Sequence, residues 1–214
     1  MNVVTVIERF AVPADKQAEA IKQATDHIIQ NWKLDAAFVG VVLLRSRDKD
    51  HGGLAAYSQW QRAVSGSVPG APLPFHSMGA ALPGFASLDA RTYTVDFSDQ
   101  AQGVAPPTRV SLRGSPQAHF GIFSLTAENQ GEMLKRAREH APKSLTTPDL
   151  GILSINFHRS IDGLQVVNLG TWTTLDHFDA LTKQPGFQDD NLYWTGVADF
   201  QYDFFDVVAV EVGQ

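Results

Sequence analysis

The chain has 214 residues, of which 43% are hydrophobic and 19% are charged, and its formal net charge is −6. These values are typical of globular material, enough for one large domain or two small ones. An acidic chain lacks the basic surface that binds phosphates, so we expect no nucleic-acid partner. No apolar run approaches the roughly 18 residues of a membrane span, and the chain has no cysteine for disulfides or thiolate chemistry. We therefore expect a cytoplasmic protein.

The first half of the chain predicts one helix followed by a hairpin, framed by two outer strands. Apolar residues recur at helical spacing from Ala18 to Trp32, after a Pro13-Ala14-Asp15 start that suits a first helical turn. Residues 62–88 are expected to form a short helix at most, because Pro69, Pro72, Pro74 and Pro83 break any long one. The predicted strands are residues 3–12, 36–45, 54–61 and 91–97.

The same order then starts again after a stretch rich in proline and glycine. Residues 98–117 carry Pro106-Pro107 and few apolar side chains, which is typical of a linker. A helical stripe follows from Gln130 to Ala141, and a second helix is expected from Thr173 to about Lys183. The predicted strands of this half are residues 119–125, 150–159, 165–172 and 199–212.

The order β-α-β-β-α-β is ferredoxin-like, and its recurrence indicates a duplication. Trp60 and Trp172 each close the third strand of a half, and each follows a hairpin whose turn carries glycine. A lone four-stranded sheet has one bare face, and two such sheets can cover each other. We therefore predict an α+β fold in which two ferredoxin-like repeats form an intrachain dimeric α+β barrel. The predicted boundaries are 1–98 for the first repeat, 99–117 for the linker and 118–214 for the second repeat.

The most informative stretch is Asn168-Leu-Gly-Thr-Trp172 in the second repeat. Side chains of a strand alternate, so Asn168, Gly170 and Trp172 share one face. An amide and an indole separated by a glycine can hold a flat, oxygen-bearing aromatic molecule, through hydrogen bonds and stacking. The first repeat keeps Trp60 but has Ala56 in place of the asparagine. We therefore place the chemistry in the second repeat.

The repeat order, the third-strand tryptophan and the Asn168-x-x-x-Trp172 pattern resemble the antibiotic biosynthesis monooxygenase family of dimeric α+β barrel proteins. The resemblance is to a tandem-repeat member, and within the family to the quinone-forming enzymes that need no cofactor. It implies an enzyme that oxidises a polycyclic aromatic substrate, such as an anthrone or phenolic polyketide, with O2. The chain departs from the family pattern in two respects: the first repeat has Ala56 in place of the asparagine, and residues 173–191 hold no tyrosine or arginine partner.

The resemblance implies that Asn168 stabilises the oxyanion and that Trp172 stacks on the substrate or donates its indole N–H. A general base would come from His177 or His158, unless the substrate ionises with little help. Trp60, His76, His158 and Tyr202 are further candidates for substrate contact. Four of the candidates also have a simpler interpretation. Trp60 would be a core anchor, His76 an exposed loop residue, and His158 and His177 solvent-facing side chains. Asn168 itself has the alternative of a satisfied buried hydrogen bond.

Two other functions remain open on the same scaffold. A polyketide cyclase or isomerase would use the same cavity without O2, and a tandem barrel that binds heme or another small molecule would need no catalysis. Heme-degrading relatives carry a histidine beyond the tryptophan, where this chain has Gly70 and Thr182, so heme is disfavoured. The histidines show no metal-ligand spacing, so no metal site is expected. Fusion of the repeats is compatible with a monomer or a homodimer.

Overall fold

A computed structural model describes residues 3–48, 52–61, 77–82, 84–113, 116–146, 151–176, 178 and 192–213. The chain forms two compact units. Unit 1 contains Met1–Thr94 and Phe205–Gln214, and unit 2 contains Val95–Phe204. Each unit combines one antiparallel sheet with helices, so the predicted α+β class is confirmed.

Unit 1 is built on the strand order β4-β1-β3-β2-β8. Its chain order is β1 (Val3–Ala11), η1 (Ala14–Lys16), α1 (Gln17–Gln30), η2 (Trp32–Leu34), β2 (Phe38–Ser46), β3 (Leu54–Gln61), α2 (Met78–Ala81) and the first part of β4 (Ala86–Gln100).

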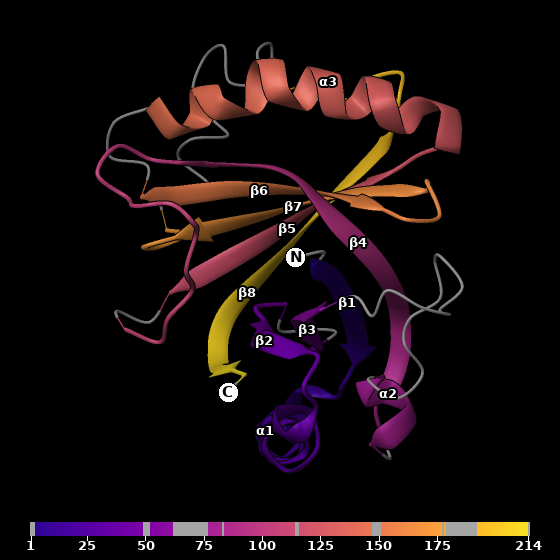
Figure 1. Cartoon of the computed structure of the whole chain (residues 1–214), viewed down its shortest axis with the longest axis vertical. Coiled ribbons are helices and arrows are strands. Elements are labelled where there is room, and N and C mark those ends of the chain that lie inside the picture. The colour runs from indigo at the N-terminus through magenta and orange to yellow at the C-terminus, as the bar shows by residue number, and fades with distance from the viewer. Residues whose placement is uncertain are drawn as a thin grey trace. The chain divides into compact units, whose positions relative to one another are not determined.

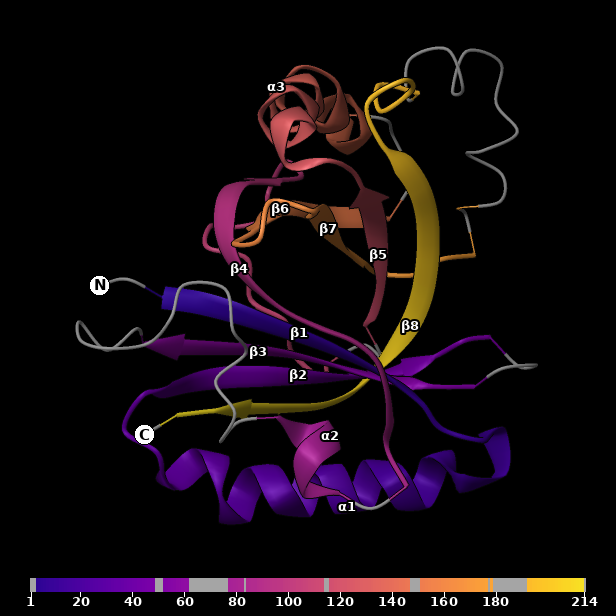
Figure 2. The same ribbon diagram turned by 90° about the vertical axis from the view of Figure 1, so that its right-hand side faces the viewer.

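The core of unit 1 lies between this sheet and α1, which runs along the sheet in Figure 2. Alternation along β1 puts Val4, Val6 and Phe10 on the helix side, and α1 buries Ala20, Ala24 and Ile28 against them. The predicted helix is confirmed, but its buried face differs from the stripe that the spacing predicted: Ile28 and Trp32 of that stripe are buried, whereas Ala18 and Ile29 are exposed.

Unit 2 repeats this plan with the strand order β8-β5-β7-β6-β4. Its chain order is β5 (Gln117–Ser124), η3 (Ala127–Asn129), α3 (Gln130–His140), η4 (Ala141–Thr146), β6 (Ile152–Ser160), β7 (Gln165–Trp172) and the first part of β8 (Asp199–Val212). Helix α3 lies along β6 and β7 in Figure 1, and it buries Met133, Leu134 and Ala137 against them. The helix predicted for residues 173–183 falls largely outside the described residues.

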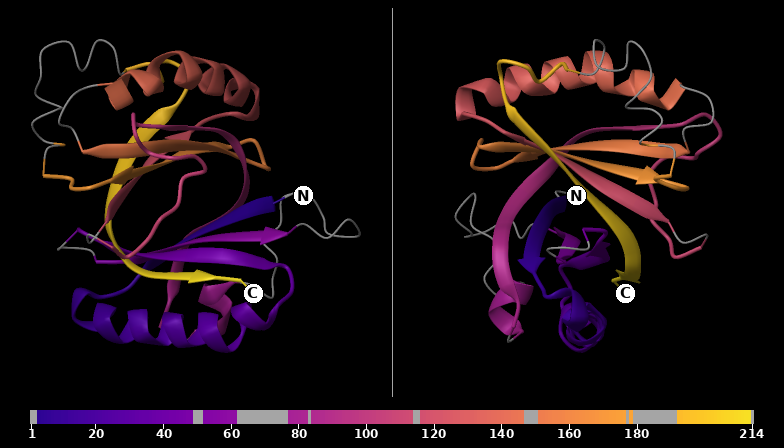
Figure 3. Two further views of the ribbon diagram at one scale, coloured as in Figure 1. Left: turned by 60° about the vertical axis from the view of Figure 1, so that its left-hand side comes forward. Right: turned by 180° about the vertical axis from the view of Figure 1, so that it is seen from behind.

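Strands β4 and β8 each begin in one unit and end in the other. Figure 3 follows β8 along its length to the C-terminal part that pairs with β2. The hydrogen-bonded order of all eight strands is β1-β3-β2-β8-β5-β7-β6-β4, and it closes on β1. A fused pair of ferredoxin-like repeats stays a prediction that this strand order supports. The units divide the chain differently from the predicted boundaries, because the end of β8 belongs to unit 1.

Most predicted strands coincide with observed ones, and β3, β7 and β8 have the predicted bounds. Strand β4 is longer than its alternating pattern predicted and extends to Gln100, into the predicted linker. The backbone N–H of Ala101, one residue beyond it, donates to the carbonyl of Leu153. Pairing with a partner distant in sequence therefore prolongs the strand through residues with no apolar alternation. Among the described residues, no helix is long and apolar enough to cross a membrane.

Candidate functional site

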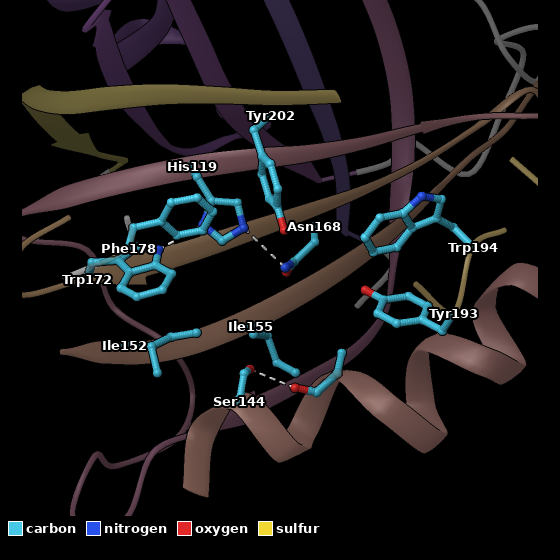
Figure 4. Close-up of a pocket in the computed structure, with 11 residues that line it drawn as sticks. His119, Ser144, Ile152, Ile155, Asn168, Trp172, Phe178, Tyr193, Trp194 and Tyr202 are labelled. Carbon is cyan, nitrogen blue, oxygen red and sulfur yellow. Dashed lines mark hydrogen bonds between the residues drawn. The ribbon is translucent and has the colours of Figure 1, made fainter. Parts of the chain in front are cut away.

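A cavity of about 50 Å³ lies within unit 2, between the sheet and the C-terminal end of α3 with η4. Figure 4 shows its lining side chains, several of which are aromatic. Strands β5, β6, β7 and β8 supply most of them, and the rest come from η4 and from the segments around Phe178 and Tyr193. The lining residues are His119, Ala141, Ser144, Ile152, Ile155, Asn168, Trp172, Phe178, Tyr193, Trp194 and Tyr202.

One glycine, Gly170, creates room for a polar side chain of this cavity. In the β5–β7 pairing, His119 lies directly opposite Gly170, and Gly121 lies directly opposite Asn168. A Cβ atom on Gly170 would lie 2.0 Å from Cε1 of His119, which no packing tolerates. The imidazole of His119 therefore occupies the space that the absent side chain of Gly170 leaves.

The side chains of Trp172 and His119 are hydrogen-bonded to each other in the wall of the cavity. The indole Nε1–H of Trp172 donates to Nδ1 of His119 over 2.7 Å, and both side chains are buried. Nε2 of the same imidazole lies 3.5 Å from the amide nitrogen Nδ2 of Asn168. The imidazole thus lies between the two residues of the Asn168-x-x-x-Trp172 pattern.

The amide of Asn168 has a defined orientation. Its Oδ1 accepts a hydrogen bond from the backbone N–H of Asn156 over 3.0 Å. An N–H group needs an acceptor, so the carbonyl oxygen must face Asn156 and the amide nitrogen must face His119. One side of the mid-strand amide is therefore satisfied by the backbone, and its N–H side is turned towards the imidazole and the cavity.

The polar groups of the cavity are neutral near pH 7. Burial lowers the pKa of the His119 imidazole to about 3. Burial also raises the pKa of the Tyr202 hydroxyl to about 12, and it raises the pKa of Tyr193. None of the described lining residues is Asp, Glu, Lys or Arg. The cavity therefore offers hydrogen bonds in apolar surroundings without a fixed charge.

The structure brings three predicted site residues together: Asn168, Trp172 and Tyr202. Trp60 is elsewhere, in the core of unit 1, where it packs against Trp32 and Phe38. Its indole N–H donates to Oγ of Ser58 over 2.9 Å. Trp60 is thus a core anchor, and the proposed substrate contact for it receives no support.

The positions of unit 1 that correspond to the cavity carry no equivalent donors. Val6 lies opposite Ser58, as His119 lies opposite Gly170, and Ala56 stands where β7 has Asn168. Val6 and Ala56 are buried in the core of unit 1. The asymmetry expected from Ala56 therefore extends to a second position, at Val6.

The polar neighbours of His158 on its strand predict exposure to solvent, but the structure buries this side chain. His158 is also not among the residues that line the cavity. It is completely buried, and its Nδ1 lies 3.3 Å from the carbonyl oxygen of Val167. Ile155 and Phe157 face α3, so alternation places His158 on the opposite face of the sheet from Asn168. Burial lowers its pKa to about 4. The position of His158 therefore gives no support to its predicted role as a base or a substrate contact at this cavity.

Two other predicted histidines, His76 and His177, lie outside the described residues. His119 was missed, because in sequence it is only the start of a strand. The sequence shows that His119 and Gly121 share one face of their strand. Only the register of the β5–β7 pairing shows that His119 lies opposite Gly170. Within the described part of the chain, no group of three or more His, Cys, Asp or Glu side chains could hold a metal ion.

The sequence matches no protein-family profile and no curated protein. Solved structures do resemble it. An anthrone oxidase-like protein has a TM-score of 0.76 at 15% identity, and the match covers 99% of this chain and 94% of the other. A ferredoxin-fold protein from Listeria monocytogenes, related to antibiotic biosynthesis monooxygenases, has a TM-score of 0.50 at 12% identity, covering 98% and 96%.

The chain has the fold of the antibiotic biosynthesis monooxygenase-like proteins. Further matched structures carry monooxygenase names. The monooxygenase-like fold also extends to a proposed chlorite dismutase, with a TM-score of 0.62 at 12% identity, covering 98% of this chain and 96% of that one. The resemblance to the family that the sequence suggested is thus confirmed at the level of the fold, which by itself specifies no reaction.

Proposed function

We propose that unit 2 holds the active site of a cofactor-independent monooxygenase, which oxidises an anthrone-like or phenolic aromatic compound with O2. The observation that carries the proposal is the amide N–H of Asn168, which Asn156 orients towards a cavity with aromatic walls and no charge among its described lining residues. An enolate oxygen is the group that such a donor stabilises best. The similarity in fold to an anthrone oxidase-like protein supports the same reaction class.

The reaction needs only the substrate and O2. The substrate loses a proton to give an electron-rich enolate, which passes one electron to O2. The carbon radical and superoxide then combine through a new C–O bond, and protonation gives a hydroperoxide. Cleavage of its O–O bond with loss of the remaining C–H proton releases water and leaves a quinone carbonyl. One oxygen atom of O2 enters the product and the other leaves as water.

The protein contributes orientation, charge stabilisation and exclusion of water. The N–H of Asn168 donates to the enolate oxygen, while the rings of Trp172, Phe178 and Trp194 enclose the aromatic plane. Burial strengthens these interactions and keeps bulk water from the radical pair. Tyr202 remains a neutral phenol, because burial raises its pKa to about 12.

The volume of the cavity limits how a polycyclic substrate can bind. At about 50 Å³ it is far smaller than the roughly 300–1,000 Å³ of typical ligand pockets. Its walls must therefore move apart for a three-ring substrate. Tyr193 and Trp194 lie in the turn before β8, so they can move without breaking a strand pairing.

Oxygen uptake by metal-free protein with an anthrone tests the proposal. Asn168→Asp is the sharpest variant, because an aspartate oxygen still accepts from the N–H of Asn156 while the donor towards the cavity is lost. We expect kcat to fall by about 100-fold or more, as when an oxyanion donor is removed elsewhere. Asn31→Ala, at an exposed position of unit 1, is the control and should leave turnover unchanged.

Each other outcome has a definite meaning. Unchanged turnover in Asn168→Asp, or uptake only after a flavin or metal is added, would refute the proposal. Product formation without oxygen uptake would indicate a cyclase or isomerase. A Soret band on titration with hemin, without turnover, would indicate a heme-binding protein.

A further inference from the structure

The contact between Trp172 and His119 determines which imidazole nitrogen carries the proton. An indole Nε1–H is a donor only, so Nδ1 of His119, 2.7 Å away, must be the acceptor. A neutral imidazole has one N–H, which is then on Nε2. Burial holds His119 in the neutral form, because it lowers the pKa to about 3.

The opposite tautomer is excluded by comparing two distances. It would place two N–H groups against each other at 2.7 Å, between Trp172 and His119. With the proton on Nε2, the facing donors are Nε2 of His119 and Nδ2 of Asn168, which are 3.5 Å apart. The repulsion between donors is much weaker at the longer distance. The 3.5 Å contact between Nε2 of His119 and Nδ2 of Asn168 is therefore not a hydrogen bond, because both nitrogens are donors.

We propose that Trp172 is a positioning residue that fixes His119 as the Nε2–H tautomer, and that the N–H groups of His119 and Asn168 together bind one phenolate or enolate oxygen. Two donors 3.5 Å apart can each reach a single oxygen at an ordinary distance of about 2.9 Å. This inference deepens the proposed function by naming the ionic form of its ligand, but the two-donor site exists independently of any reaction with O2.

The same geometry leaves His119 without a basic nitrogen for the substrate. Its lone pair on Nδ1 is engaged by Trp172, and no described lining residue is a carboxylate or an amine. The site therefore takes ligands that ionise themselves near neutral pH, and it prefers their anions, because a hydrogen bond to a charged oxygen is about twice as strong as one to a neutral oxygen. Acidic phenols and enols form this class.

The tautomer is measured directly by NMR of protein labelled with ¹⁵N-histidine, with His119→Gln assigning the signals. We expect a protonated Nε2 and a bare Nδ1 in the wild-type protein. Trp172→Phe removes the donor and should convert His119 to a mixture of tautomers. Trp60→Phe changes the corresponding tryptophan of unit 1 and should leave the pattern unchanged, which separates positioning from general loss of packing.

Binding of 4-nitrophenol tests the ligand class, because its phenolate is coloured. We expect the bound phenol to ionise at a pH at least one unit lower than the free phenol, and 4-nitroanisole, which has no ionisable oxygen, to bind at least tenfold more weakly. Asn168→Asp and His119→Phe should each abolish the shift.

Several outcomes would overturn the inference: an Nδ1–H tautomer in the wild-type protein, an unchanged tautomer in Trp172→Phe, or failure to bind 4-nitrophenol in preference to 4-nitroanisole. Failure of the proposed function looks different. Phenolate binding and the Nε2–H tautomer without any oxygen uptake would refute the monooxygenase and leave the two-donor site in place.

Discussion

Gly170 and His119 face each other across β5 and β7, and the imidazole fills the space that a side chain on Gly170 would need. The nearest approach of a Cβ atom would be 2.0 Å to Cε1 and 2.5 Å to Nδ1, the nitrogen that accepts from Trp172. The glycine of the Asn168-x-Gly170-x-Trp172 pattern thus has a direct structural role, because it allows the histidine of another strand to reach the tryptophan and the asparagine.

Gly170→Ala should therefore displace His119 and destabilise the protein. Overpacking of a buried position costs about 1–3 kcal/mol, which urea denaturation can measure, and binding of 4-nitrophenolate should be lost. Gly131→Ala is the matched control, since no heavy atom lies within 4 Å of the added Cβ in α3. There alanine should stabilise by up to about 1 kcal/mol. Equal stability of Gly170→Ala and wild type would contradict this packing.

Stability should fall as the pH is lowered from 6.5. Burial lowers the pKa of His119 to about 3 and that of His158 to about 4, so the unfolded chain binds protons that the folded chain cannot. The unfolded state binds more protons in this window, so the free energy of unfolding rises with pH by up to about 1.4 kcal/mol per unit for each histidine. The stability that depends on keeping these two histidines neutral is therefore complete above pH 6.5 and is lost as the pH falls towards 3–4.

Urea denaturation between pH 7.5 and 5 measures this slope. His119→Gln and His158→Gln should each reduce it, and the double variant should reduce it further. Glu8 contributes a slope of the opposite sign, because burial raises its pKa and the folded chain therefore holds a proton that the unfolded chain has lost. Glu8 is unchanged in all the variants, so the difference in slope between them and the wild type reports the histidines alone. Equal slopes in the wild type and the double variant would show that His119 and His158 do not cause the pH dependence.

Glu8 should anchor α2 to the sheet of unit 1. Its carboxylate is buried, and it accepts from the hydroxyl of Ser77 over 2.8 Å and from the backbone N–H of Met78 over 3.0 Å. Glu8→Gln sets an NH2 group against one of these donors. We expect a loss of about 1–3 kcal/mol and faster hydrogen exchange at residues 78–81. Glu19→Gln, on the exposed side of α1, should change stability by less than about 0.5 kcal/mol, and equal effects would argue against the anchor.

Ser58→Ala should lower the stability of the protein without changing ligand binding at the cavity of unit 2. Oγ of Ser58 accepts from the indole of Trp60 in the core of unit 1, so its removal should cost about 1–3 kcal/mol. Thermal denaturation should show this loss while the affinity for 4-nitrophenolate stays unchanged, because the donors of the cavity belong to unit 2. A fall in affinity comparable to that in His119→Phe would place the tryptophan of unit 1 in the binding machinery.

The sequence by itself determined the elements and one half of the candidate site. Strand β7 could be delimited as residues 165–172 by its apolar run and flanking turn, and a period of two puts Asn168 and Trp172 on one face whatever the strand pairs with. Local patterns carry this information because side-chain direction depends only on neighbouring backbone geometry. The loss of the asparagine at Ala56 was visible for the same reason.

Only the tertiary structure decided which residues complete the site. His119 is 49 positions away from Asn168 and meets it only because β5 pairs with β7 in one register. A shift of that register by one residue would turn His119 to the other face of the sheet. His158 was misplaced for a related reason, since a polar strip on a strand does not reveal which face is buried. Pairing between distant strands, rather than any local pattern, makes Trp172 a partner of His119.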